Sequence, residues 1–154
     1  VVATKVVYYD LRKEMPSRTH HRGEGREAPA KIGHAVNRFF TEHGQTAEIT
    51  PADGEPFRVL TGPIGSGEAV IADRDAEIRR YLTSFNDKVL AVDMESGGLT
   101  QFCHEHAGHP EGWVIVRGIS DHATSEKNDE HHHRAAWHAA IVLRALIPYL
   151  LDDL

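Results

Sequence analysis

The sequence predicts an α/β fold, in which helices cover a central sheet. Short runs of β-branched and apolar residues alternate with segments whose apolar residues recur at helical spacing. The chain has 154 residues, of which 40% are hydrophobic and 26% are charged. That size and composition are typical of one globular domain.

Four segments have the composition of strands: residues 1–9, 57–60, 88–92 and 113–119. The last of these, Trp-Val-Ile-Val-Arg-Gly-Ile, is predicted to be a buried strand. Residues 10–27 contain Pro16 and two glycines, and we expect them to form a long polar loop. This stretch is basic, with Arg12, Lys13, Arg18, Arg22 and Arg26. The simpler interpretation is a solvated loop without a specific role. The more specific alternative is a lid that contacts a nucleotide phosphate.

Four segments have the spacing of helices. The first follows Pro29, ends at Gly44 and has its apolar positions at Ile32, Ala35, Val36, Phe39 and Phe40. The second is capped by Asp73 and carries Ile78, Tyr81 and Leu82 on one face. The third covers residues 94–106, with Leu99, Phe102 and Cys103 expected to point inward. The fourth covers residues 129–150, and Pro148 is expected to end or kink it. Its expected packing face consists of Ala135, Ala136, Ala139, Val142, Leu143 and Leu146.

Carboxylates follow two of the predicted strands. Asp93 and Glu95 come directly after residues 88–92, and Asp121 follows residues 113–119. Ligands of open α/β sheets bind beyond the carboxyl ends of strands, so these acids are candidates for a binding site. An equally simple interpretation places Asp93 and Glu95 in the first turn of a helix, where acids interact favourably with the dipole. In that interpretation Asp121 is an ordinary turn residue.

Four motifs resemble elements of the methylthioadenosine/S-adenosylhomocysteine nucleosidases and the related purine nucleoside phosphorylases. Residues 91–96 (AVDMES) resemble "V-E-M-E-A", residues 116–121 (VRGISD) resemble "V-R-x-I-S-D", and residues 66–71 (SGEAVI) resemble "S-G-D-x-F-I". Residues 1–6 resemble an internal strand of the same fold. The resemblance implies a three-layer αβα fold with a central mixed sheet, with residues 1–154 as the C-terminal part of a single domain. It is closest to a bacterial subgroup fused to other domains in large defence or signalling proteins.

The resemblance also implies an activity, the cleavage of the N-glycosidic bond of purine nucleosides or nucleotides, by hydrolysis. Asp121 matches the acid that donates a proton or a hydrogen bond to purine N7. Glu95 matches the carboxylate that accepts hydrogen bonds from the ribose hydroxyls. The residues expected to contact substrate around this pair are Met94, Asp93, Ser120, Ile71 and Val70.

The sequence departs from the family pattern at three points. Asp93 stands where Glu is usual, and Val70 stands where an aromatic ring often stacks on the base. The family's N-terminal part, which supplies the acid/base that activates water and a Gly-rich anion site, is not in the chain. We therefore expect the chain by itself to be inactive or nearly so. Phosphorolysis and purine binding without turnover stay open as alternatives.

Composition argues against several other functions. A net charge of −6 argues against general nucleic-acid binding. The single cysteine, Cys103, allows no intrachain disulfide and suits the cytoplasm, and no apolar run approaches the length needed to span a bilayer. The twelve histidines lack the H-E-x-x-H spacing, so we expect neither a metal nor a cofactor. By resemblance to the family, we expect a homo-oligomer or a part of a larger multi-domain chain.

Overall fold

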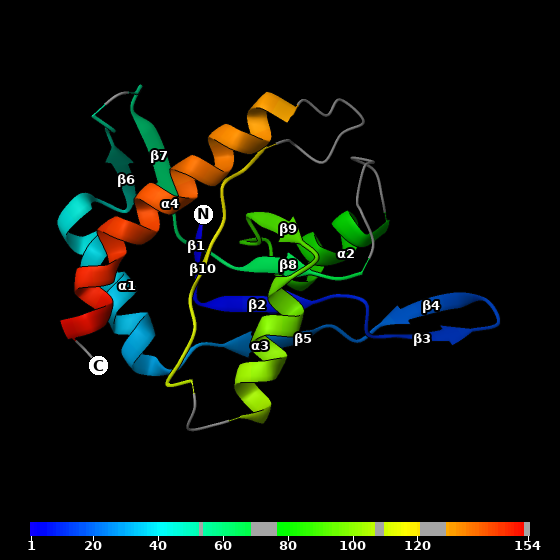
Figure 1. The fold of residues 1–154 in the computed structure, drawn as a ribbon. Helices are drawn as coiled ribbons and strands as arrows, with labels where there is room; N and C mark the ends of the chain where they lie inside the picture. The colour runs from blue at the N-terminus through cyan, green and yellow to red at the C-terminus, as the bar shows by residue number, and fades with distance from the viewer. Residues whose placement is uncertain (53, 69–76, 107–109, 121–128, 153–154) are drawn as a thin grey trace.

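A four-stranded mixed sheet forms the centre of the fold (Figure 1). The computed structural model describes residues 1–52, 54–68, 77–106, 110–120 and 129–152. The strand order is β5 (Glu24–Glu27), β2 (Lys5–Tyr8), β8 (Ile64–Ser66) and β9 (Ala91–Asp93). β2, β8 and β9 are parallel, and β5 pairs with β2 in the antiparallel direction.

Helices cover both faces of this sheet, α3 (Ser96–Glu105) on one and α2 (Glu77–Phe85) on the other. Val6 belongs to an apolar cluster that contacts Cys103 of α3. Its neighbour Val7 belongs to a different cluster, together with Leu82 of α2. Successive side chains of a strand point to opposite faces, so the two clusters lie on opposite sides of β2. The predicted α/β fold with a central mixed sheet is confirmed.

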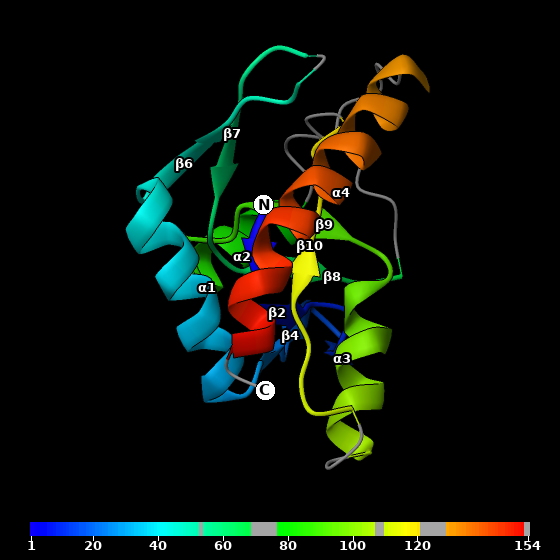
Figure 2. The same ribbon diagram turned by 60° about the vertical axis from the view of Figure 1, so that its left-hand side comes forward.

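A second packing region lies beside the sheet, where α1 (Ala30–His43) and α4 (Asp129–Asp152) run side by side (Figure 2). Two antiparallel strand pairs adjoin them, β1 (Val2–Ala3) with β10 (Ile115–Val116) and β6 (Thr46–Ile49) with β7 (Phe57–Leu60). Their shared core consists of Val2, Val36, Phe39, Phe40, Ala47, Val59, Val142 and Leu146. The predicted first helix is confirmed, including its end at Gly44, whose φ of 94° suits glycine.

The prediction of a loop over residues 10–27 is wrong. Residues in this stretch form a hairpin, β3 (Arg12–Met15) with β4 (Arg18–His21), followed by β5 of the central sheet. β6 and β8 also lie outside the four segments predicted to be strands. The described side chains of β3 are exposed and polar or charged apart from Met15, so the hairpin has no apolar alternation to reveal it.

The inward face predicted for the third helix is also wrong. Leu99 and Phe102 are 47% and 52% exposed, whereas Ser96, Gly97 and Thr100 of α3 are buried. Small side chains face the sheet because α3 approaches it closely, with Gly97 packed against Tyr8. Cys103 is half-buried against the neighbouring apolar cluster.

The last helix and the strand before it differ from prediction in detail. α4 continues through Pro148 to Asp152, because Leu146 and Tyr149 on either side of the proline pack into the shared core. Within its expected face Ala136 and Leu143 are exposed. The strand predicted over residues 113–119 is regular only at β10.

α4 is also long and apolar enough to cross a membrane by length and mean hydropathy, with a value of 1.2 over its segment His131–Asp152. The expectation that no segment reaches that threshold is therefore wrong. In the structure Ala135, Val142 and Leu146 of this helix are buried, the last two in the core shared with α1. A core helix of a globular domain satisfies the same two criteria.

Candidate functional site

The three parallel strands end level with one another, which creates one polar edge. Tyr8, Ser66 and Asp93 are register partners at the carboxyl ends of β2, β8 and β9. Backbone hydrogen bonds continue past these ends, from the Gly67 N–H to the Asp93 carbonyl at 3.1 Å and from the Tyr9 N–H to the Ser66 carbonyl at 3.0 Å. This edge is where open α/β sheets bind ligands.

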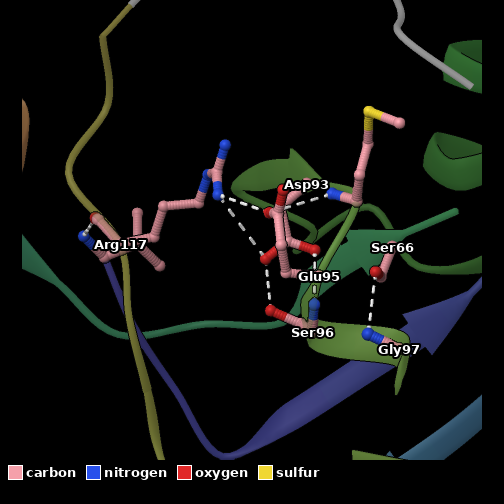
Figure 3. Close-up of polar contacts among 8 residues, drawn as sticks. Ser66, Asp93, Glu95, Ser96, Gly97 and Arg117 are labelled. Atoms are coloured by element: carbon pink, nitrogen blue, oxygen red, sulfur yellow. Dashed lines mark hydrogen bonds and ion pairs between the residues drawn. The ribbon is translucent and has the colours of Figure 1, made fainter. Parts of the chain in front are cut away.

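The Asp93 carboxylate is buried and forms hydrogen bonds within the protein. Its side chain is 3% exposed, and its Oδ1 accepts a hydrogen bond from the Ser96 N–H at 3.1 Å. The Ser96 hydroxyl donates to Oδ2 of the same carboxylate (Figure 3). An aspartate before a helix commonly satisfies the free N–H groups of the first turn in this way. Asp93 itself ends β9 and Glu95 is the N-cap residue of α3, so neither acid lies in the first turn of the helix as the alternative interpretation placed them.

Glu95 lies two residues further along and is oriented differently. Its side chain is 77% exposed, and Oε2 accepts hydrogen bonds from Arg117 Nη1 and from the Met94 N–H, both at 3.3 Å. The same Arg117 Nη1 lies 3.8 Å from Asp93 Oδ2, so one guanidinium faces both carboxylates (Figure 3). The arrangement leaves Glu95 with an accessible carboxylate beside a fixed positive charge.

A second contact fixes α3 to the sheet below the carboxylates. Ser66 Oγ accepts a hydrogen bond from the Gly97 N–H at 2.8 Å, and Thr100 Oγ1 donates to the Gly97 carbonyl at 3.1 Å. All of these groups are buried. β8 therefore sets the position of the helix that begins immediately after Glu95.

Sequence reasoning assigned no role to Arg117 or Ser66, which the fold brings to this edge. Arg117 lies within the VRGISD stretch and Ser66 begins the SGEAVI stretch, so the motifs contained both residues. Their roles depend on pairing across the sheet, which a linear motif does not specify. Arg117 is held by antiparallel pairing of its backbone with Val1, at 2.7 and 2.8 Å.

The remaining predicted site residues divide into two groups. Met94 is exposed, and Ser120 is half-buried three residues after Arg117. Val70, Ile71 and Asp121 lie outside the residues that the structure describes.

Two tyrosines at the end of β2 are held in the neutral form. Burial, together with the neighbouring negative charge of Asp10, raises the pKa of Tyr9 to about 12. Burial and the carboxylates of Glu68 and Asp10 also raise the pKa of Tyr8, whose hydroxyl lies 3.5 Å from Glu68 Oε1. Neither phenol is therefore a base near neutral pH.

The described residues include no group of three or more His, Cys, Asp or Glu side chains placed to hold a metal ion. A cavity of about 170 Å³ lies between β7, β10 and α4, with Arg58, Val116, Arg117 and His138 in its wall. Asp93 and Glu95 do not line it. The carboxylate site lies at the carboxyl ends of β2, β8 and β9.

Comparison with known protein families matches residues 1–148 to the phosphorylase superfamily. The chain belongs to the phosphorylase superfamily. It is 39% identical over 84 residues to the ATP nucleosidase Cap17 of Escherichia coli strain KTE188. The matched part is 54% of the chain and 16% of that relative.

Solved structures of nucleosidases have the same fold. The S-adenosylhomocysteine nucleosidase of Streptococcus pyogenes superposes with a TM-score of 0.66 at 18% identity, over 95% of this chain and 58% of that one. The 5′-methylthioadenosine/S-adenosylhomocysteine nucleosidase of Neisseria meningitidis gives 0.64 at 19%, over 99% and 61%. The futalosine hydrolase of Helicobacter pylori gives 0.64 at 19%, over 99% and 59%. The chain thus spans about three fifths of the length of these structures.

Proposed function

We propose that the protein to which this superfamily chain belongs cleaves the N-glycosidic bond of purine nucleosides or nucleotides by hydrolysis. The observation that carries the proposal is the accessible Glu95 carboxylate at the edge of the parallel strands, held by Arg117 and the Met94 N–H. Residues 1–154 are proposed to be the C-terminal part of one nucleosidase-like domain. The nucleosidase names of its relatives support the same reaction.

Hydrolysis breaks the bond from the sugar carbon to the purine nitrogen and forms a bond from that carbon to the oxygen of a water, whose activation the resemblance assigns to the family's N-terminal part. The residues of this chain act on the base and on the sugar. Positive charge develops on the sugar and negative charge on the departing purine. In the proposal Asp121 protonates or hydrogen-bonds purine N7, which is worth about 10²–10⁴ in rate for a general acid. Glu95 accepts hydrogen bonds from the ribose hydroxyls, which orients the sugar and favours its cation-like transition state.

The other proposed contacts surround these two carboxylates. Met94 packs on the sugar, and Ser120 helps to hold the base end next to Asp121. Ile71 meets the base edge through its backbone, and Val70 forms the adjoining wall. Asp93 contributes by positioning, because its carboxylate is occupied by Ser96 and faces the same Arg117 as Glu95.

The direct test measures purine release by the full-length protein from a panel of nucleosides and nucleotides, with and without phosphate. Release without phosphate is expected, and Asp121→Asn and Glu95→Gln should each lower it by about 10²-fold or more. Glu105→Gln is the matched control, because it removes an exposed carboxylate at the opposite end of α3. It should leave the rate unchanged.

Other outcomes would support other functions. Release only in the presence of phosphate would indicate phosphorolysis. Purine binding without release under any condition would contradict the enzyme and leave a non-catalytic binding module. Equal losses in Glu105→Gln and Glu95→Gln would remove the assignment of Glu95.

The setting of the activity is also a proposal. A cytoplasmic location suits a chain with one cysteine and a purine nucleoside or nucleotide substrate. Assembly into a homo-oligomer, or fusion within a larger multi-domain chain, is consistent with exposed apolar side chains on α3. Size-exclusion chromatography with light scattering on the full-length protein would measure the assembly.

A further inference from the structure

The hairpin β3–β4 has two faces of different charge. Opposite residues of an antiparallel pair share a face, and residues two apart along a strand share it too. The register pairs Lys13 with His20 and Met15 with Arg18, so these four side chains lie on one face. The described members of the other face include Arg12 and Glu14, which form an ion pair at 2.9 Å.

The first of these faces, the Lys13–Arg18–His20 face, carries cations and no carboxylate. Neither Lys13 nor Arg18 makes an ion pair within the described parts of the chain, and both are exposed. The protein as a whole has a net charge of −6, so this face is a local positive patch on an acidic chain. Such a patch attracts anions over a range of about a Debye length.

The base of the hairpin lies at the same edge as the carboxylate site. β2 leads into the hairpin, and the hairpin extends beyond the end of that strand (Figure 1). Asp10 at its base accepts a hydrogen bond from the Glu68 N–H, and the preceding Gly67 N–H binds the Asp93 carbonyl. Two strand spacings separate the ends of β2 and β9, which is about 10 Å.

Two other cations near this edge already contact protein groups. Arg117 faces Asp93 and Glu95, and Arg26 pairs with Glu24 at 3.3 Å and lies 3.5 Å from the Gly97 carbonyl. A polyanion bound beside the carboxylates of this edge, which include Asp10 and Glu68 at the base of the hairpin, needs compensating positive charge. The Lys13–Arg18–His20 face can supply it, together with the exposed Arg22 at the base of the hairpin.

We propose that the Lys13–Arg18–His20 face binds the 5′-phosphate chain of a purine nucleotide, so that the protein prefers nucleotides to nucleosides. This inference rests on the proposed function, because it concerns the substrate of the same site. Lys and Arg make charge-assisted hydrogen bonds to phosphate oxygens, and a chain of phosphates can reach along a strand beyond the sugar. Glu95 would hold the ribose while the hairpin holds the phosphates.

The test compares two variants that remove the same charge from opposite faces. Arg18→Gln changes the proposed face, and Arg12→Gln changes the other face of the same hairpin. In the full-length protein, kcat/KM is measured for ATP and for adenosine. Arg18→Gln should lower kcat/KM for ATP about tenfold, and Lys13→Gln/Arg18→Gln should lower it further. Adenosine cleavage should not change, and Arg12→Gln should have little effect on either substrate.

Three results would overturn the proposal: equal losses for ATP and adenosine, equal losses in Arg12→Gln and Arg18→Gln, or no loss in the double variant. If the protein cleaves neither compound, the proposed function fails and the hairpin is tested by equilibrium binding of ATP and adenosine. Weaker ATP binding in the double variant, with adenosine binding unchanged, would still support the hairpin site. Failure of the wild-type protein to bind ATP would reject it.

Discussion

Asp93 and Glu95 stand two residues apart in the sequence, and the fold gives them different environments. Asp93 ends a strand of the sheet, so its side chain is enclosed and bonds to the first turn of α3. Glu95 is the N-cap residue of α3, and its carboxylate is exposed to solvent beside Arg117. The sequence identified both acids as candidates, but an ordinary place in the first turn of a helix accounted for them equally simply. Burial distinguishes the two residues: Asp93 is enclosed and structural, whereas Glu95 is exposed and available to a ligand.

Two substitutions of Asp93 should separate the contribution of its hydrogen bonds to Ser96 from that of its negative charge. Asp93→Ala removes both acceptors of Ser96 and should lower the free energy of unfolding by about 1–2 kcal/mol, since a cap is lost and buried donors are left unsatisfied. Asp93→Asn keeps one acceptor and should cost less. Urea unfolding monitored by circular dichroism measures both. Glu95→Gln is the control, with an expected change within about 0.5 kcal/mol. Equal losses in the Ala and Asn variants would show that charge, not capping, is what matters.

At the scale of elements, α3 is positioned by its smallest residues. Gly97 faces the sheet and donates its N–H to Ser66, while Gly98 faces open space. A Cβ on Gly97 would lie 2.9 Å from Tyr8 Cδ2 and 3.2 Å from Ser66 Oγ. The close approach explains why the larger Leu99 and Phe102 point outward. Apolar spacing predicted the helix but placed the wrong face against the sheet.

The adjacent glycines provide a matched pair for testing this contact. Gly98→Ala should raise the free energy of unfolding by up to about 1 kcal/mol, because alanine favours the helix and meets nothing. Gly97→Ala should lower it by about 1–3 kcal/mol, because the added Cβ would press on Tyr8 of β2 and Ser66 of β8. Thermal unfolding compares the two. A shift of the same sign in both variants would contradict a close contact at Gly97.

At the scale of the whole molecule, the central sheet with α2 and α3 adjoins the region built from α1, α4, β6 and β7. His138 of α4 stacks on Phe57 of β7, with ring centroids 4.0 Å apart and an interplanar angle of 10°. Burial and the nearby Arg134 charge lower the pKa of His138 below its ordinary value of 6.5. The fold therefore favours the neutral imidazole at this junction.

Stability should consequently fall in mild acid. Below pH 6.5 the unfolded chain protonates His138 before the folded one does, so the unfolded state gains stability as the pH falls towards the folded pKa. His138→Phe keeps an aromatic ring on Phe57 and cannot titrate. The difference in unfolding free energy between wild type and His138→Phe should change in favour of the variant from pH 7 to pH 5. A difference independent of pH would contradict a lowered pKa.

The sequence by itself determined the fold class, the positions of most helices and the two acidic motifs. Those features depend on local patterns: apolar runs, helical spacing, and Pro29 and Gly44 at the ends of one helix. It also supported membership of the superfamily through motifs in order along the chain. It could not supply the hairpin or β5, because paired polar strands gain their hydrogen bonds from one another rather than from an apolar face.

Only the tertiary structure decided which groups meet at the edge of the sheet. Arg117 and Glu95 are 22 residues apart, and Ser66 and Gly97 are 31 apart. Parallel pairing of β2, β8 and β9 makes their ends level and brings Ser66 to the Gly97 N–H. Antiparallel pairing with Val1 brings Arg117 to Glu95. The same pairing buried Asp93 and left Glu95 exposed. Such contacts arise from register and burial, which no single segment of the sequence contains.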